Sequence, residues 1–233
     1  MKKILVFVML SVVTLHAQKE LTFIENINSS QDIYLNFKFA QNIKVEHGNS
    51  NEVTVKVSVN IDDGEGNTYF NVLTERSSDS LKMYSDFGDY FKNKRNDKGK
   101  NSWNCNSVTE IDYVVMVPKG VNLKIKSISG DVYMDSFQGD LVTDLISGDV
   151  TIKKYEGELR LKTISGALDV IVSRADLSAK SITGTIYSDI DFKPEVNSKA
   201  YHRSYNKVTK KINGGTQPLH METISGNIYI RKG

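Results

Sequence analysis

The sequence is poor in the residues that usually reinforce a small exported protein. Its only cysteine, Cys105, cannot form an internal disulfide, so the fold must depend on its core and on backbone hydrogen bonds. Only three prolines and one tryptophan occur among the 233 residues, and glycine is present at an ordinary level. This composition does not favour long disordered segments.

Side chains in a catalytic or metal-binding spacing are also missing from the sequence. The four histidines, His16, His47, His202 and His220, do not have the spacing of metal ligands. The Ile-Ser-Gly triplets lack the glycine that precedes the serine of a nucleophile elbow. We therefore expect no catalytic residue, no metal site and no cofactor.

Neither sign of charge is in excess. Loss of Lys2 and Lys3 with a signal peptide would reduce the 30 basic residues to the number of acidic residues, which is 28. A chain of about zero net charge without a dense basic stripe does not suggest a nucleic-acid partner.

One long apolar run is present, and it lies at the N-terminus. Lys2 and Lys3 precede the run from Ile4 to Leu15, and Ala17 offers a small residue for cleavage. This order is typical of a signal peptide over residues 1–17, and the run is short for a transmembrane helix. We expect an exported protein in the periplasm, on the cell surface or secreted, with no membrane span after cleavage. An uncleaved N-terminal anchor is the alternative.

Residues 18–117 alternate apolar and polar side chains with a period of two. The segment from Val53 to Val59, for example, has valine at every second position. Such segments, bounded by Gly, Asn, Asp or Pro, predict β-strands. Residues 86–106 are polar and rich in lysine, and we interpret them as a long exposed loop. We find no helical period in the mature chain.

A nine-residue repeat begins after Pro118. Glycine recurs every nine positions, with Ala175 in one slot, and an aliphatic residue follows each slot by two positions. The glycines are Gly130, Gly139, Gly148, Gly157, Gly166 and Gly184. The positions two before each slot are Ile128, Phe137, Ile146, Tyr155, Ile164, Ser173 and Ile182. Because these positions share the parity of the aliphatic residues, we expect both sets to face the interior.

The true period is eighteen, since Ile-Ser/Thr-Gly recurs only at every second unit. Two strand-turn units per period predict a coil with two walls. One wall would stack Val132, Val150, Leu168 and Ile186, and the other Leu141, Leu159 and Leu177. Each unit has one apolar face and buries it only by stacking on its neighbours.

The expected fold is all-β. Residues 118–233 would form a β-solenoid, a right-handed parallel β-helix-like stack of 18-residue coils, preceded by a strand-rich region over residues 18–117. An irregular insertion at about 193–217 interrupts the repeat, which returns from Leu219 to Ile230. Because the end of a solenoid exposes unpaired backbone groups, we expect the insertion to cover an edge.

One segment of the chain resembles a known family. The run from Val115 to Ile125, followed by Ile-Ser-Gly-Asp-Val units, is similar to a bacterial family of exported β-strand-repeat proteins labelled "putative adhesin", a domain of unknown function related to the GIN head domain. Asn42 to Gly48 resembles the opening of that domain. The resemblance implies a β-solenoid fold and an envelope or surface location, and it implies no reaction.

Two other kinds of site can be weighed against the repeat. Calcium-binding β-rolls need a second glycine two residues before the aligned one, where this chain has large residues such as Ile128 and Phe137. A polysaccharide-active β-helix enzyme would need a site that breaks the repeat, and the insertion offers His202, Arg203 and Glu195.

We therefore interpret the chain as a non-catalytic module of the cell envelope or a secreted module, either an adhesin or a ligand-binding or structural protein. Exposed rings at Tyr133, Tyr187 and Tyr229 could stack on a ligand, and a surface glycan or an envelope protein would be the partner. The alternatives are a β-helix lyase or glycosidase, and a periplasmic partner of an envelope-stress regulator.

Overall fold

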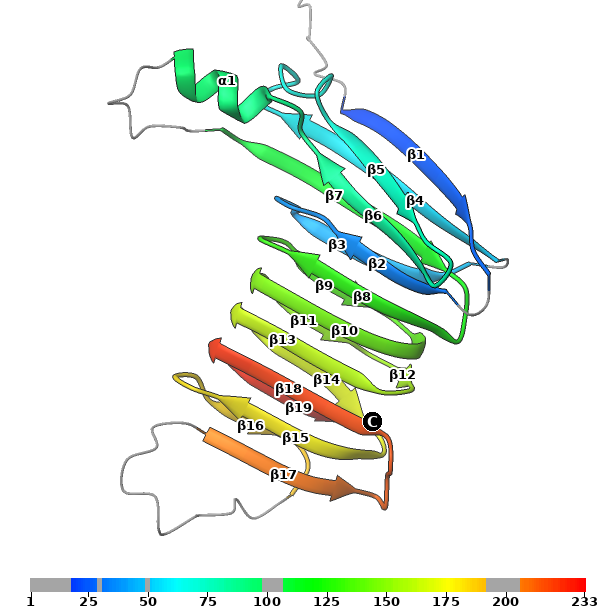
Figure 1. Cartoon of the computed structure of the whole chain (residues 1–233). Coiled ribbons are helices and arrows are strands. Elements are labelled where there is room, and N and C mark those ends of the chain that lie inside the picture. Colours follow the sequence, from blue (N-terminus) through cyan, green and yellow to red (C-terminus); the bar gives the residue numbers. More distant parts are fainter. Residues whose placement is uncertain (1–17, 29–30, 49–50, 98–106, 192–205) are drawn as a thin grey trace, which may run out of the picture.

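The chain folds into two large, mostly parallel β-sheets that face each other across one core (Figure 1). The computed structural model describes residues 18–28, 31–48, 51–97, 107–191 and 206–233. The expected signal peptide therefore lies outside the described residues. So do Trp103, Cys105, Glu195, His202 and Arg203.

The first sheet has nine strands. Their spatial order is β1 (Lys19–Asn26), β4 (Glu52–Ile61), β7 (Thr109–Val117), β3 (Asn42–His47), β9 (Asp131–Met134), β11 (Val150–Ile152), β14 (Leu168–Val172), β19 (Ile228–Lys232) and β16 (Ile186–Ser188).

The second sheet has ten strands. Their order is β17 (Asn206–Ile212), β15 (Ala175–Ser181), β18 (Pro218–Ser225), β13 (Leu159–Ser165), β10 (Phe137–Ser147), β8 (Val121–Ser127), β2 (Asp32–Asn36), β6 (Ser80–Asp86) and β5 (Asn71–Arg76), with β12 (Tyr155–Glu156) beside β10.

The described strands pair antiparallel only near the two ends of the stack. The antiparallel pairs are β1 with β4, β4 with β7, β5 with β6, and β15 with β17. Between them the chain passes repeatedly from one sheet to the other, and each strand pairs parallel with its equivalent in the next layer. Both sheets continue across the boundary expected at Pro118, because β2 and β3 pair with β8 and β9.

The aliphatic ladders predicted from the repeat are present. Val132, Val150 and Leu168 are register partners in the nine-stranded sheet, and Leu141 pairs with Leu159 in the other. Partners in these pairs lie eighteen positions apart, and all five side chains are buried. Packing of equivalent side chains from neighbouring layers therefore forms the central core.

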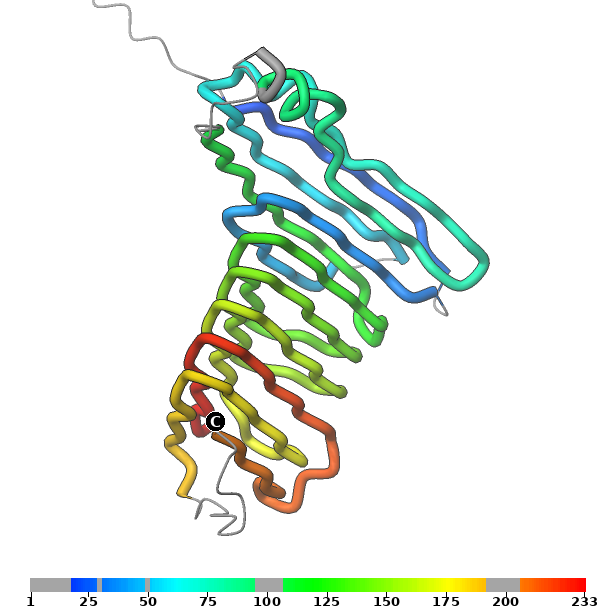
Figure 2. Tube along the Cα trace, turned by 60° about the vertical axis from the view of Figure 1, so that its left-hand side comes forward, coloured from blue at the N-terminus to red at the C-terminus, as the bar shows by residue number. Residues whose placement is uncertain are grey.

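The last layers of the stack do not follow the order of the sequence, which corrects part of the expected ladders. Strands β18 and β19 lie between the layer of β13 and β14 and the layer of β15 and β16 (Figure 2). The pairs observed are Leu159–Leu219, Leu219–Leu177, Leu168–Ile228 and Ile228–Ile186. The later segment fits because it repeats the spacing of buried residues found in its neighbours.

A second correction concerns the isoleucine before each Ser/Thr-Gly pair. Ile128, Ile146, Ile164 and Ile182 were expected inside, but they are exposed, with Ile146 at 51%. The physical reason is that each of these isoleucines directly follows an inward residue of a long strand, whereas Phe137, at the same place in an alternate unit, begins its strand and is buried. Inward residues of a strand such as β10 fall at every second position up to Leu145, so the next residue points outward.

The interior of most of these corners holds a hydroxyl instead of the isoleucine, and at Ile146 it holds Leu145. Thr163, Ser181 and Thr223 are fully buried, and each hydroxyl donates a hydrogen bond to a glycine carbonyl of a neighbouring layer at 2.9–3.2 Å. The glycines themselves are in close contact. A Cβ added to Gly166 would lie 2.0 Å from the Gly148 carbonyl oxygen. Glycine is therefore required by the closeness of the layers as well as by the turn.

The polar segment 86–106 is not one exposed loop, because it contains the helix α1 (Tyr90–Asp97). The ring centroid of Phe91 lies 5.5 Å from that of Phe39 and 5.2 Å from that of Phe87. This aromatic packing holds the helix against the N-terminal end of the stack.

The insertion at about 193–217 was expected to cover an edge, and its described part does so. Strand β17 pairs antiparallel with β15 along seven register positions and forms the outermost strand of the ten-stranded sheet. Residues 192–205 of the insertion lie outside the described residues.

Candidate binding face on the ten-stranded sheet

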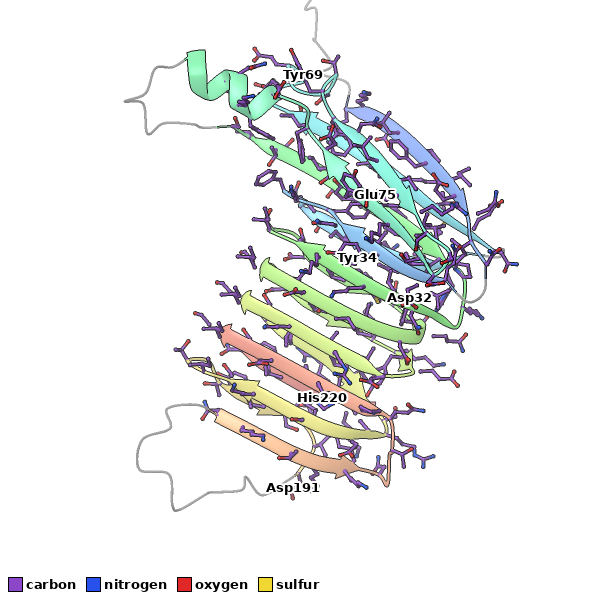
Figure 3. The ribbon with its side chains drawn as sticks, in the orientation of Figure 1. Asp32, Tyr34, Tyr69, Glu75, Asp191 and His220 are labelled. Atoms are coloured by element: carbon purple, nitrogen blue, oxygen red, sulfur yellow. The ribbon has the colours of Figure 1, made fainter. Side chains whose placement is uncertain are left out.

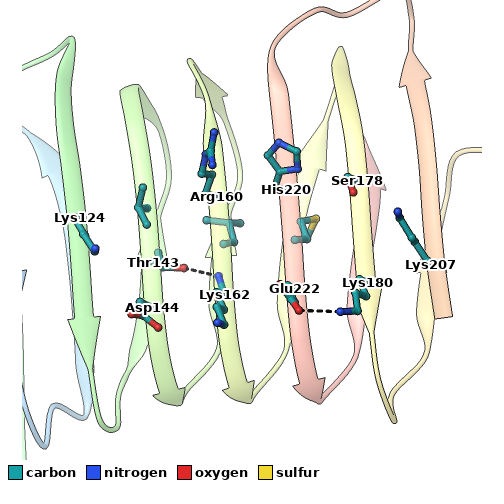
Figure 4. Close-up of a pocket in the computed structure, with 13 residues that line it drawn as sticks. Lys124, Thr143, Asp144, Arg160, Lys162, Ser178, Lys180, Lys207, His220 and Glu222 are labelled. Atoms are coloured by element: carbon teal, nitrogen blue, oxygen red, sulfur yellow. Dashed lines mark hydrogen bonds and ion pairs between the residues drawn. The ribbon is translucent and has the colours of Figure 1, made fainter. Parts of the chain in front are cut away.

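The outer face of the ten-stranded sheet carries a shallow groove. It has a volume of about 470 Å³ and crosses β8, β10, β13, β18, β15 and β17 (Figure 4). Side chains alternate along each strand, so the aliphatic residues face the core and the polar residues between them line the groove. Figure 3 places Asp32, Tyr34 and His220 on this same sheet.

Seven basic side chains from five strands gather on this face, and we call them the basic band. Its members are Lys82, Lys124, Lys126, Arg160, Lys162, Lys180 and Lys207. Register pairing places their positions in two adjacent rows that run across the strands. Two carboxylates, those of Asp144 and Glu222, lie between the cations of these rows, and a third, that of Glu75, adjoins Lys82 at the β5 end, where it accepts a hydrogen bond from the Tyr84 hydroxyl.

Both carboxylates within the rows are already paired. Asp144 Oδ2 lies 3.1 Å from Lys126 Nζ, and Glu222 Oε1 lies 3.1 Å from Lys180 Nζ. The hydrogen bond to Asp144 raises the pKa of Lys126 above its ordinary value. The remaining positive charge of the rows is therefore directed toward solvent.

The other cations in the groove have weaker partners. Lys124 Nζ lies 5.8 Å from the ring centroid of Tyr34, which is within the range of a cation–π contact. Arg160 forms an ion pair with Glu158 on the surface, where such pairs contribute little. The backbone N–H of Lys162 donates to the hydroxyl of Thr143, which leaves the ammonium group of Lys162 outside that interaction.

An acidic row lies beside the basic band, at the beginnings of the strands. It consists of Asp32, Asp140, Glu158 and Asp176. The Asp140 carboxylate accepts a hydrogen bond from the backbone N–H of Glu158 at 2.8 Å. On the other sheet, Asp131 accepts from the backbone N–H of Asp149 in the same way. Aspartate after the glycine slot therefore links one layer to the next.

The three tyrosines proposed as ligand contacts lie on the opposite sheet. The rings of Tyr187 and Tyr229 are stacked, with centroids 5.2 Å apart and planes 9° apart. Tyr133 is separated from them by the positions of Thr151 and Asp169 in the register. The structure thus brings two of the three rings together and leaves the third separated from them by two strands.

The surroundings of these rings differ as well. The Tyr133 hydroxyl donates to Asp135 at 2.6 Å, and Lys153 lies over its ring. Arg231 lies 5.6 Å from the ring centroid of Tyr229 and donates three hydrogen bonds to Asp169. Tyr187 is half exposed because it stands on the outermost strand of its sheet.

Neither of the two described histidines shares a cluster of metal-ligating side chains. His47 Nε2 accepts a hydrogen bond from the backbone N–H of Gln138, and His220 lines the groove. Within the described ranges, no three His, Cys, Asp or Glu side chains are arranged to hold a metal ion. No described helix has both the length and the apolar character needed to cross a membrane.

Two facing, mostly parallel sheets around one aliphatic core define a solenoid-like β-repeat protein. Residues 117–231 match the family Toastrack DUF4097, and this part of the chain belongs to that family. A comparison with curated proteins found no match.

One solved structure supports the same fold class. A "putative cell adhesion protein" from Clostridium sporogenes has a TM-score of 0.54 and 13% sequence identity, and the match covers 93% of this chain and 100% of the other. A "putative adhesin" from Bacteroides fragilis matches over 94% of this chain and 99% of the other, at a TM-score of 0.35 and 10% identity. At 13% identity the Clostridium structure establishes the fold and not the function.

Proposed function

We propose that the chain is an exported, non-catalytic binding module of the cell envelope, of adhesin type. We further propose that it contacts its partner through the outer face of the ten-stranded sheet. The observation that carries the proposal is the groove across six strands, whose carboxylates are paired and whose cations face solvent. The apolar run at residues 4–15 supports export.

The shape of the face favours binding of an extended partner over chemistry on a small one. Catalysis needs groups held in a water-excluded site, whereas this groove is shallow and open on a sheet surface. The pairing of residues eighteen positions apart supports the finer architecture that we propose, a right-handed solenoid of 18-residue coils. Such a stack presents the same outward position in every layer, which suits a repetitive ligand.

We test the proposal by measuring binding and turnover of the same ligands. The purified chain, without residues 1–17, is applied to an array of bacterial surface glycans and to isolated cell-envelope fractions. We expect retention without release of shortened products. Release of new reducing ends or unsaturated sugars would favour a lyase or glycosidase, and absence of binding to both arrays and envelopes would contradict the proposal.

The tyrosine pair is proposed as a second contact, for an uncharged sugar ring. One ring face of Tyr187 is directed away from Tyr229 at the edge of the sheet, and aromatic faces of this kind pack on apolar faces of ligands. We expect Tyr187→Ala to weaken binding of a neutral glycan by roughly tenfold. The matched control is Tyr69→Ala, whose ring is as exposed as that of Tyr187 but lies outside both sheets, and equal loss in both variants would contradict the assignment.

A further inference from the structure

We infer that the basic band is a track for a linear acidic polysaccharide, which lies along the axis of the stack and crosses the strands from β6 to β17. This inference rests on the proposed function and names the ligand class of the same face. Four steps support it: the spacing of the charges, their exposure, the position of the acidic row, and the lack of features that other polyanions need.

The first step is the spacing. Neighbouring strands of a sheet lie about 4.8 Å apart, so equivalent outward positions recur at that interval along the stack axis. Lys162, Glu222, Lys180 and Lys207 occupy consecutive register positions on β13, β18, β15 and β17. A polymer with one charge per repeating unit therefore meets side chains at regular intervals.

The second step is exposure. Lys124, Arg160, Lys162 and Lys207 are exposed, whereas Asp144 and Glu222 are half-buried and paired. The carboxylates thus hold their neighbouring lysines in place without cancelling the outer cations. A polyanion that approaches this face meets the ammonium and guanidinium groups first, which raises the rate of encounter.

The third step is orientation. The acidic row runs parallel to the basic band, from Asp32 through Asp140 and Glu158 to Asp176. A polyanion laid along a strand would cross this row and meet like charge. A polyanion laid along the stack axis stays over the basic band, so the two rows together select one direction.

The fourth step separates an acidic polysaccharide from nucleic acid and from a lipid surface. Single-stranded nucleic acid is bound by successive aromatic rings on which bases stack. From β8 to β17 the two rows carry no described aromatic ring other than that of His220. Tyr34 and Tyr84 stand at the β2–β6 end of the rows, where Lys124 lies over the ring of Tyr34. A lipid surface favours large apolar side chains beside the cations. The exposed isoleucines lie at the corner of the stack and not within the groove.

The experiment uses the full mature chain and defined polymers. Binding of polygalacturonate oligomers, heparin and neutral dextran is measured by titration calorimetry at low and at moderate salt. We expect binding of an acidic polymer, weakening with salt, and we expect the double variant Arg160→Glu/Lys162→Glu to lose roughly tenfold or more in affinity. The matched control is Lys56→Glu/Lys153→Glu, with Lys56 on β4 of the other sheet and Lys153 directly after its strand β11. It makes the same change in net charge and should change affinity by less than about twofold.

The outcomes separate the two proposals. An equal loss of affinity in both double variants would show that the basic band is not the binding site, while acidic polysaccharide binding itself would stand. Binding of neutral glycans only, unaffected by the band variant, would overturn the inference and leave the proposed function standing. Tighter binding of single-stranded DNA or of anionic vesicles than of any polysaccharide would overturn the ligand class. Unchanged circular dichroism and gel-filtration volume show that each variant is folded.

Discussion

At the scale of single residues, most Ile-Ser/Thr-Gly corners combine a buried hydroxyl with a glycine, and the sequence pattern presents the two very differently. The glycine can be recognised from its period, but nothing in the repeat pattern indicates that the hydroxyl of Thr163 or Ser181 is buried. Its role follows only from the alternation along the preceding strand, which places Thr163 inward and the next residue, Ile164, outward.

The first prediction concerns this hydroxyl. Thr163→Val keeps the shape of the buried side chain but leaves the Gly148 carbonyl without its 3.1 Å donor. We expect the free energy of unfolding to fall by about 1–2 kcal/mol, measured by urea denaturation. Thr185→Val, at an exposed position near another corner, is the control and should change stability by less than about 0.5 kcal/mol. Equal stability of the two variants would show that the buried hydroxyl is dispensable.

The second prediction concerns the closeness of the layers. In Gly166→Ala the new Cβ would lie 2.0 Å from a backbone oxygen, so the layers must separate. We expect a loss of about 3 kcal/mol or more in unfolding free energy, or failure to fold. In Gly48→Ala the nearest atom is 3.6 Å away, and that variant should be close to neutral. A well-folded Gly166→Ala protein of wild-type stability would contradict the close stacking.

The third prediction gives the pH dependence of the N-terminal end. The Asp62 carboxylate accepts hydrogen bonds from Tyr90 Oη at 2.7 Å, Lys94 Nζ at 2.5 Å and the Val108 backbone N–H at 2.9 Å. Burial of Asp62 opposes its ionisation, but these hydrogen bonds outweigh burial and hold its pKa below the ordinary value.

Because the folded pKa is the lower one, Asp62 stabilises the fold fully above the unfolded pKa of about 4 and loses this effect as the pH falls through the folded pKa. We expect Asp62→Asn to be less stable than the wild type at pH 7 and the difference to shrink toward pH 3, measured by thermal unfolding. A difference that is constant with pH would contradict this role. Asp63→Asn, at the neighbouring position, is the control.

At the scale of elements, the sequence predicts the strands well and their order only in part. Most strands were expected from alternation and from the glycine period, because both patterns are local. The order of the last layers is not local. The segments around Leu177 and Leu219 have the same spacing of buried residues, so either one fits against β13. Helix α1 was missed because eight residues contain too few turns for a helical period.

The fourth prediction tests the order of the layers by hydrogen exchange. Because β18 pairs on both sides, its amides should be among the most protected of the chain, together with those of β13. Amides of β16, which pairs on one side only, should exchange sooner. Mass spectrometry of peptides covering residues 218–225 and 185–189 measures the difference. Exchange of β18 as fast as that of β16 would contradict the position of β18 between β13 and β15.

At the scale of the whole molecule, the candidate binding face could not have been predicted from the sequence. Its cations come from five strands spread between residues 80 and 212, and none of them lies in the lysine-rich segment 86–106. Glu222 and Lys180 are 42 residues apart and become neighbours only through the out-of-order layer. The near-zero net charge of the chain therefore gives no indication that basic and acidic side chains form separate, parallel rows on this face.

The inserted layer also has a consequence for biosynthesis. Residues 218–232 are made after both layers that flank them, so β15 and β16 cannot reach their final place until that later segment has emerged. A polypeptide that ends before residue 218 would lack β18 and β19. The apolar residues of the two flanking layers would then have no neighbouring layer to pack against. We therefore expect truncated chains to be cleaved by proteases more readily than complete chains, in which the inserted layer covers these residues.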